Sequence, residues 1–165
     1  HWSNIENSKK LLNNLRNFKK AGQVIAYLKK IDAYLMEEVV LSSLEAQGHR
    51  IIRNDRYSGD GGIDGKAVIF GKKYYIQTKR YRDHISKSDM VKFIAKCRTD
   101  NVKGLFVHTG KTGRNTRRLA RGSNDVTVVS GDNLYRLIKG KSFGVSRSTW
   151  YVICRIIDKI FYTDR

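Results

Sequence analysis

The feature of this sequence that most constrains its fold is a β-hairpin in the middle of the chain. Residues 63–69 (IDGKAVI) are predicted to form one strand, Gly71-Lys72 the turn, and residues 74–81 (YYIQTKRY) the returning strand. Side chains alternate between the two faces of a strand, so Gln77 and Lys79 share a face. The hairpin brings Asp64 level with Gln77. One acid, one amide and one ammonium group are therefore predicted to meet at one end of the hairpin.

The segments before the hairpin predict helices and one further strand. Apolar residues at three-and-four spacing over residues 8–30 indicate one amphipathic helix, or two short helices broken near Gly22. A second helix is predicted from Asp32, a plausible N-cap, to Gln47, with Gly48 as its left-handed stop. Residues 49–54 (HRIIRN) are predicted to form the first strand.

The second half of the chain alternates helices with strands. A helix within residues 86–100 (SKSDMVKFIAKCRTD) is predicted with Ser86 or Ser88 as its cap, and residues 104–109 (GLFVHT) are predicted to form a buried, parallel strand. The rest of the chain predicts a short basic helix within residues 109–122, a strand over 125–130 and a small helix over 131–140 that is capped by Asp132. The order is αβββαβ with an αβα extension. The predicted fold class is α/β, with a mixed central sheet flanked by helices.

Length and composition indicate a single compact domain. The chain has 165 residues and 40% apolar content, enough for one core without disulfides. We expect an N-terminal helical extension over residues 1–31, a core over 32–139 and a C-terminal helix over 140–165. That last helix carries an apolar stripe of Trp150, Ile153, Ile157 and Ile160, which packs on the N-terminal helix or forms a dimer contact.

The location expected for the chain is the cytoplasm of a bacterium, or of the host of a mobile element. The sequence shows no apolar run of membrane-span length and no secretory leader, although His1 leaves the true start open. The cysteines, Cys97 and Cys154, are isolated and far apart, as is typical of reduced, buried thiols.

The charge distribution favours a polyanionic partner. The formal net charge is +18, and residues 71–122 hold fifteen Lys and Arg against three Asp, which places +12 of that total there. Charge clustered beside Lys79 is typical of a nucleic-acid footprint. The alternative is a solvated, lysine-rich surface of the kind common in AT-rich genomes.

The predicted helix after Asp32 places an acid on its apolar face. Glu37 shares that face with Val40, Leu41 and Leu44, whereas Glu38 is expected with Ser42 and Glu45 on the wetter flank. An inward carboxylate needs a partner such as a metal, a bound water or Lys79. The alternative is an ordinary boundary glutamate that turns outward.

Over residues 32–139 the chain resembles the Mrr-like restriction endonucleases, a branch of the PD-(D/E)XK nuclease superfamily. The resemblance is carried by Glu37, the run GDGGIDG, the strand YYIQTKRY and the later GLFVHTG. It implies a restriction-endonuclease-like core and a Mg²⁺-dependent DNA endonuclease, with modified DNA as one candidate substrate and Mn²⁺ as a substitute metal. The catalytic residues implied are Glu37, Asp64, Gln77 and Lys79.

The resemblance also implies a ligand set. Asp64, Gln77 and the backbone carbonyl of Thr78 would hold the metal directly, and Glu37 would hold it through a water. The wider superfamily has a glutamate where this chain has Gln77, so the metal meets one negative charge fewer. Lys79 would orient the attacking water or stabilise developing charge, and the product would carry a 5′-phosphate.

Two neighbouring features have more than one interpretation. The glycines of the GDGGIDG run are either plain turn residues or the means by which a phosphodiester approaches Asp64 closely. Asp60 is expected to form a turn rather than to join the site. His108 either contacts phosphate or ends its strand, and it is not predicted to be catalytic.

The predicted partner is DNA, without a membrane, and a homodimer is favoured because a double-strand cut by a small domain needs two centres. The predicted DNA contacts flank the proposed site or lie on the basic helix: Arg80, Arg82, Lys111, Arg114, Arg117, Arg118 and Arg121. The alternatives are a structure-specific nuclease, such as a Holliday-junction resolvase, and a catalytically weak or inactive DNA-binding module of a mobile element. RNA as substrate stays open.

Overall fold

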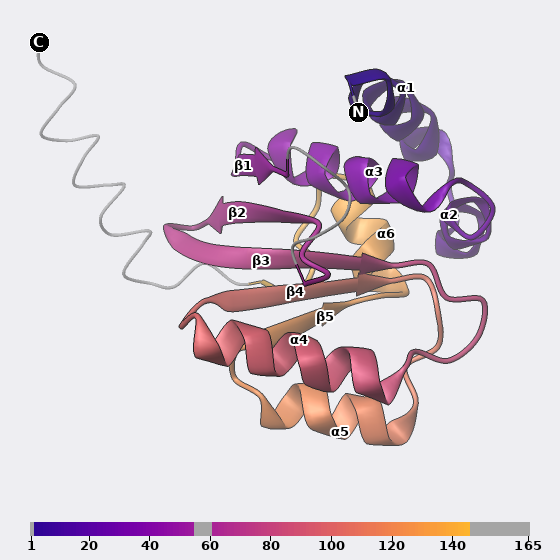
Figure 1. Ribbon diagram of the computed structural model, residues 1–165. Coiled ribbons are helices and arrows are strands. Elements are labelled where there is room, and N and C mark those ends of the chain that lie inside the picture. The colour runs from indigo at the N-terminus through magenta and orange to yellow at the C-terminus, as the bar shows by residue number, and fades with distance from the viewer. Residues whose placement is uncertain (1, 55–60, 146–165) are drawn as a thin grey trace, which may run out of the picture.

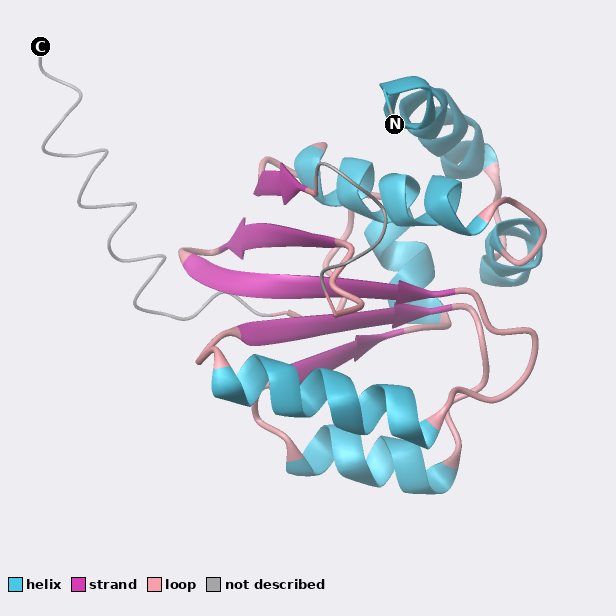
Figure 2. Ribbon diagram, in the orientation of Figure 1, coloured by secondary structure: helices cyan, strands magenta, loops and turns pink. Residues whose placement is uncertain are grey.

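A computed structural model describes residues 2–54 and 61–145, which form a mixed five-stranded sheet between two layers of helices (Figures 1 and 2). The strands lie in chain order across the sheet: β1 (Arg50–Arg53), β2 (Gly65–Ile69), β3 (Lys72–Lys79), β4 (Lys103–His108) and β5 (Val126–Val129). β2 is antiparallel to both of its neighbours, β1 and β3, and β3, β4 and β5 are parallel. The α/β class with a mixed sheet is confirmed.

Helices cover both faces of the sheet (Figure 1). One layer holds α1 (Trp2–Asn17), α2 (Ala21–Leu28), α3 (Ala33–Glu45) and α6 (Asp132–Ile138), and the other holds α4 (Lys87–Thr99) and α5 (Arg114–Gly122). The αβββαβ order from α3 to β4, followed by the αβα extension, is as predicted. The N-terminal segment forms two helices, with the break at residues 18–20, just before Gly22.

Each face of the sheet has its own apolar core. Ile76, Leu105 and Val107 point toward α3 and belong to the larger core. Phe106, on the opposite face of β4, packs with Phe93 and Cys97 of α4. β4 is buried along almost its whole length because helices cover both of its faces, as its continuously apolar sequence predicted.

The helix that carries Glu37 begins and ends as predicted. The Asp32 side chain accepts hydrogen bonds from the backbone N–H groups of Tyr34 and Leu35, and Gly48 takes a positive φ of 82° after the last turn. The predicted wet flank is wrong at two of its three positions. Glu38 is 1% exposed and Ser42 is 2% exposed, because α1 and β1 cover this side of α3, and only Glu45 is exposed.

The predicted helix caps and the predicted buried cysteine have different outcomes in the structure. Ser86 is the cap of α4, and its side chain accepts from the backbone N–H of Asp89. Asp132 does not cap α6 but is its first residue, since Gly131 holds the cap position. Cys97 is a buried free thiol, as predicted. Of the helix predicted over 140–165, residues 140–145 are described and are not helical, while its apolar stripe and Cys154 lie outside the described residues. No helix among the described residues has the length and apolarity of a membrane span.

Candidate active site

The start of β2 and the end of β3 meet as the hairpin predicted. The backbone N–H of Asp64 donates to the carbonyl of Ile76 at 2.8 Å, and Ile76 is also the pairing partner of Gly65. Asp64 therefore lies just before the first residue of β2, next to the Ile76–Thr78 end of β3. Its carboxylate accepts a hydrogen bond of 2.5 Å from the backbone N–H of Thr78, and this bond fixes the orientation of the carboxylate.

The same bond shows where the Thr78 carbonyl points. Within a strand, the N–H and C=O of one residue project to the same side. Because the Thr78 N–H points toward Asp64, its carbonyl also lies on the β2 side of β3. Lys79 is the next residue, and its carbonyl points the other way, to accept from the Thr109 N–H. The Thr78 carbonyl therefore faces the Asp64 side, as the predicted ligand set requires.

Gln77 is held by a glycine turn. Its Nε2 donates to the Gly62 carbonyl at 2.6 Å. A Cβ on Gly62 would lie only 2.5 Å from that Nε2, and Gly62 has a φ of +83°, so a glycine is required here for two reasons. Gln77 is 6% exposed, and its Oε1 is buried without a hydrogen-bond partner among the described residues. A buried, unpartnered amide oxygen is an acceptor in need of a ligand.

Glu37 of α3 lies close enough to this turn to interact with Asp64. Burial, and then the charge of Asp64, raise the pKa of Glu37 to about 8, while the charge of Lys79 acts in the opposite direction. Burial also raises the pKa of Asp64 to about 6, against the Thr78 hydrogen bond and Lys79. Two carboxylates that repel each other in a partly desolvated place favour protons or a cation.

The Lys79 ammonium influences both acids without pairing directly with either. Its charge lowers the pKa of Glu37 and of Asp64, yet within the described part of the chain no salt bridge joins it to a carboxylate. The structure therefore brings together all four predicted catalytic residues, with the charged groups set apart from one another.

The donor set fits a hard divalent cation. Two carboxylates, the unpartnered Gln77 oxygen and the Thr78 carbonyl are all oxygen donors, which Mg²⁺ prefers to nitrogen or sulfur. Across residues 2–54 and 61–145, no group of three or more His, Cys, Asp or Glu could hold a metal. A cation at Asp64 would therefore rely on the amide and carbonyl oxygens, and on water, to complete its shell.

Sequence comparison now decides the family. The model of the Mrr_cat family, described as restriction endonuclease, matches residues 28–138, about two thirds of the chain. The chain belongs to this restriction endonuclease family. The Mrr_cat match runs from the end of α2 to the end of α6 and includes Glu37, Asp64, Gln77 and Lys79.

Two other comparisons add little to the Mrr_cat assignment. No curated protein matches the chain. A solved structure titled MspJI restriction endonuclease in complex with a 27-mer oligonucleotide is similar at 16% sequence identity and a TM-score of 0.44. The similarity covers 95% of this chain and 35% of that one, so this chain spans about a third of the length of that protein.

All seven predicted DNA contacts of this Mrr_cat domain are exposed, but they differ in their surroundings. The Arg80 guanidinium donates to the carbonyls of Ile31 at 2.8 Å and Lys29 at 3.4 Å, so it also fastens the end of β3 to the α2–α3 connection. Arg82 and Lys111 lie in the neighbouring loops. The arginines of α5 diverge: Arg117 and Arg121 line a pocket beside β5, whereas Arg118 lines a groove against α4.

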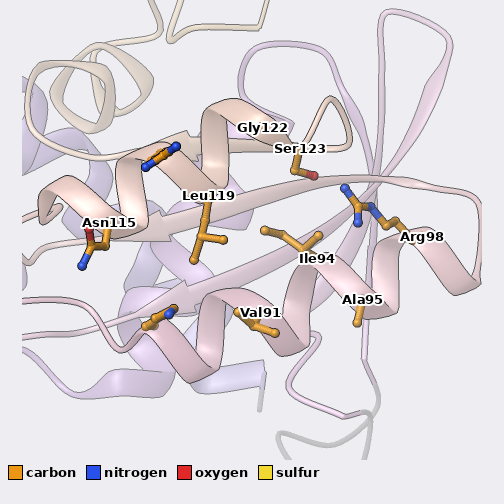
Figure 3. Close-up of a pocket in the computed structure, with 10 residues that line it drawn as sticks. Val91, Ile94, Ala95, Arg98, Asn115, Leu119, Gly122 and Ser123 are labelled. Carbon is orange, nitrogen blue, oxygen red and sulfur yellow. The ribbon is translucent and has the colours of Figure 1, made fainter.

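Figure 3 shows that groove, with Val91 and Ile94 of α4 facing Leu119 of α5. Its floor is apolar, and Val91 is 45% exposed. Arg98 at its rim pairs with Asp125 at 3.3 Å. An apolar floor with a partly neutralised rim is a poor surface for phosphate. The groove differs in this respect from the pocket on the other side of α5, which Arg117 and Arg121 line.

His108 is a buried side chain at the end of β4, which its sequence context did not reveal. It is fully buried, so it cannot touch a phosphate directly, and that interpretation is wrong. It stands level with Lys79 on the adjacent strand, and its Nε2 lies 3.1 Å from the Thr112 Oγ1. Burial lowers the pKa of His108 to about 4, against the effect of the Gly110 backbone, so the imidazole is neutral. Asp60 lies outside the described residues.

Proposed function

We propose that this protein is a metal-dependent DNA endonuclease that hydrolyses phosphodiester bonds with Mg²⁺, for which Mn²⁺ can substitute. One observation carries the proposal: Glu37, Asp64, Gln77 and Lys79 converge at one end of the β2–β3 hairpin, with two mutually repelling carboxylates and an unpartnered amide oxygen. Membership of a restriction endonuclease family supports the reaction class.

The chain offers the cation a partly rigid set of oxygens. Asp64, the Gln77 Oε1 and the Thr78 carbonyl would be direct ligands, and Glu37 would act through a water. When bound, Mg²⁺ supplies positive charge at the scissile phosphate and increases the acidity of a water. The Thr78 N–H orients Asp64, and the Gly62 carbonyl orients the Gln77 amide, so neither ligand needs to reorganise much.

The remaining steps are assigned to side chains of the chain. Lys79, free of a direct salt bridge among the described residues, donates hydrogen bonds to the attacking water or to a non-bridging phosphate oxygen. Glu37, with a pKa raised to about 8, holds a water and can exchange a proton with it near neutral pH. The water oxygen forms a new bond to phosphorus as the P–O3′ bond breaks, the water gives up a proton, and the leaving 3′-oxygen takes up a proton from solvent, which leaves a 5′-phosphate and a 3′-hydroxyl.

DNA is the proposed substrate because of where the charge lies. The surface around the site carries exposed Arg82, Lys111 and the arginines of α5, within the segment that holds +12 of the net charge. Cations in this arrangement neutralise backbone phosphates without reading sequence. A second copy of the chain would place a second centre on the complementary strand.

The test compares wild type with Asp64→Asn and Lys79→Ala on supercoiled plasmid, methylated and unmethylated, in Mg²⁺, Mn²⁺ or EDTA at low salt. We expect nicked or linear product only with wild type and only with metal, while both variants still retard the plasmid. Linear product without accumulation of nicked circles would indicate a dimer. Retarded but intact DNA from wild type would overturn the endonuclease and favour a binding module. Preference for a four-way junction would redirect the proposal to a structure-specific nuclease.

A further inference from the structure

A polar pocket of about 420 Å³ lies along the open edge of β5 and is distinct from the four-residue site. Arg117 and Arg121 of α5 contribute one wall. Thr112, from the β4–α5 connection, and Ser130, at the end of β5, contribute hydroxyl groups, and Asn133 of α6 contributes an amide. None of the residues that line the pocket is acidic.

The two arginines are available to an anion. Residues four apart on a helix lie on the same face, so Arg117 and Arg121 project together. Within the described residues neither guanidinium pairs with a carboxylate, and the hydrogen bond from Arg117 to the Thr112 carbonyl is long, at 3.4 Å. Two unpaired guanidinium groups beside hydroxyl and amide donors match a phosphate group, whose oxygens accept several charge-assisted hydrogen bonds.

The pocket stands in register with the proposed catalytic lysine. Lys79 of β3 is the partner of His108 in β4, and Val107 is the partner of Val129 in β5, so the next residues, His108 and Ser130, are also level. These three residues therefore form a row across three parallel strands. Adjacent strands lie about 4.8 Å apart, which places Ser130 roughly 10 Å from Lys79.

Side-chain contacts join His108 to Ser130 through Thr112. The His108 Nε2 lies 3.1 Å from the Thr112 Oγ1, and that oxygen lies 3.4 Å from the Ser130 Oγ. His108 is fully buried between Lys79 and the pocket. The spacing between pocket and catalytic lysine is thus set by the sheet and by a packed side chain rather than by an exposed loop.

We propose that this pocket binds one phosphate of the DNA strand that is cut, and so sets the register of cleavage. The inference rests on the proposed function, since it assumes that the scissile phosphate lies beside Lys79. One strand of B-DNA presents a phosphate about every 3.4 Å of helix axis, so the phosphate in the pocket lies within about three nucleotides of the scissile one. It is either an internal phosphodiester or a terminal 5′-phosphate.

The test is a binding measurement in EDTA with short duplexes that each carry a single uncharged methylphosphonate, moved one position at a time. Wild type is expected to lose roughly 10-fold in affinity at one position, because charge-assisted hydrogen bonds to that phosphate disappear. The Arg117→Gln/Arg121→Gln variant should bind the unmodified duplex roughly 10-fold more weakly and show no further loss at that position. Duplexes with a 5′-hydroxyl or a 5′-phosphate distinguish the two sources.

A matched control uses the same helix and the same loss of charge. The Arg114→Gln/Arg118→Gln variant removes two positive charges from α5 but leaves the pocket intact, so it should keep the position-specific loss. The same profile in wild type and in both variants would overturn the pocket, whether or not the protein cuts plasmid. Conversely, a position-specific profile in a protein that cuts nothing would keep the pocket and overturn the endonuclease.

Discussion

Two adjacent glutamates on α3 have opposite surroundings, and the difference separates stability from function. Glu38 is 1% exposed and paired with the Arg53 Nε at 2.9 Å, and the same guanidinium also binds Glu45. Glu37 forms no salt bridge with any described residue, and its burial, followed by the charge of Asp64, raises its pKa to about 8. An acid that is partly buried and left uncompensated destabilises the fold, which suggests that the place is kept for a ligand.

The largest expected effect is a loss of stability when Glu38 is deprived of its partner Arg53. Arg53→Ala leaves the Glu38 carboxylate buried without its cation, and breaking such a pair typically costs about 3–5 kcal/mol of unfolding free energy. Urea unfolding would measure it. Arg98→Ala is the control, because its pair with Asp125 is exposed to solvent and should contribute little to stability. Equal losses from the two variants would show that the Glu38 pair is not a structural one.

At Lys79, near Glu37, we expect the opposite: a large loss of activity with little loss of stability. Lys79→Ala should leave the unfolding midpoint nearly unchanged, because no described salt bridge or hydrogen bond depends on its ammonium. The cleavage rate should fall by about 10²–10³-fold, the cost of removing one donor that stabilises transition-state charge. Single-turnover cleavage and binding in EDTA would measure both quantities. A comparable loss of binding would assign Lys79 to DNA affinity instead of chemistry.

A substitution in the glycine turn beside Gln77 should reduce both stability and metal affinity. Gly62→Ala places a Cβ 2.5 Å from the Gln77 Nε2 and puts a side chain at a φ of +83°. The backbone strain alone costs about 1–2 kcal/mol. The displaced amide should also weaken metal binding, measured by calorimetry with Mg²⁺. Gly61→Ala is the control: it has a similar φ of +64° but no atom within 4 Å of its Cβ, so it should reduce stability without changing metal affinity.

These residues also show what the sequence could and could not predict. The hairpin and the Asp32 cap were predictable because turn residues and strand alternation are local signals. The predicted turn at Gly71-Lys72 is wrong by one residue: Ile69 pairs with Lys72, so the turn is Phe70-Gly71, both with positive φ, and β3 covers 72–79 rather than 74–81. The burial of Glu38 was not, because it depends on α1 folding over a flank of α3 that looks polar in sequence. The row from Lys79 to Ser130 requires the pairing of strands distant in sequence, which no short motif encodes.

The smallest effect expected is the most informative about Glu37. Its pKa is about 8 in the folded protein and 4.5 as the ordinary value, so between these values the folded state binds more protons than the unfolded state. The metal-free protein therefore loses stability as pH rises from about 4.5 to 8. Glu37→Gln removes that loss, and in EDTA at pH 8.5 it should unfold at a higher temperature than wild type, by roughly 2–4 °C for about 1 kcal/mol.

At pH 5 the carboxyl group of Glu37 is protonated in the folded state and resembles a glutamine, so wild type and Glu37→Gln should unfold at nearly the same temperature in EDTA. Adding Mg²⁺ at pH 8.5 should stabilise wild type more than the variant, because the cation compensates the ionised acid. Thermal unfolding at both pH values, with and without Mg²⁺, measures all four cases. A Tm difference in EDTA that is independent of pH would mean that Glu37 is solvated like any surface acid, and the contrast with Glu38 would then reflect packing alone.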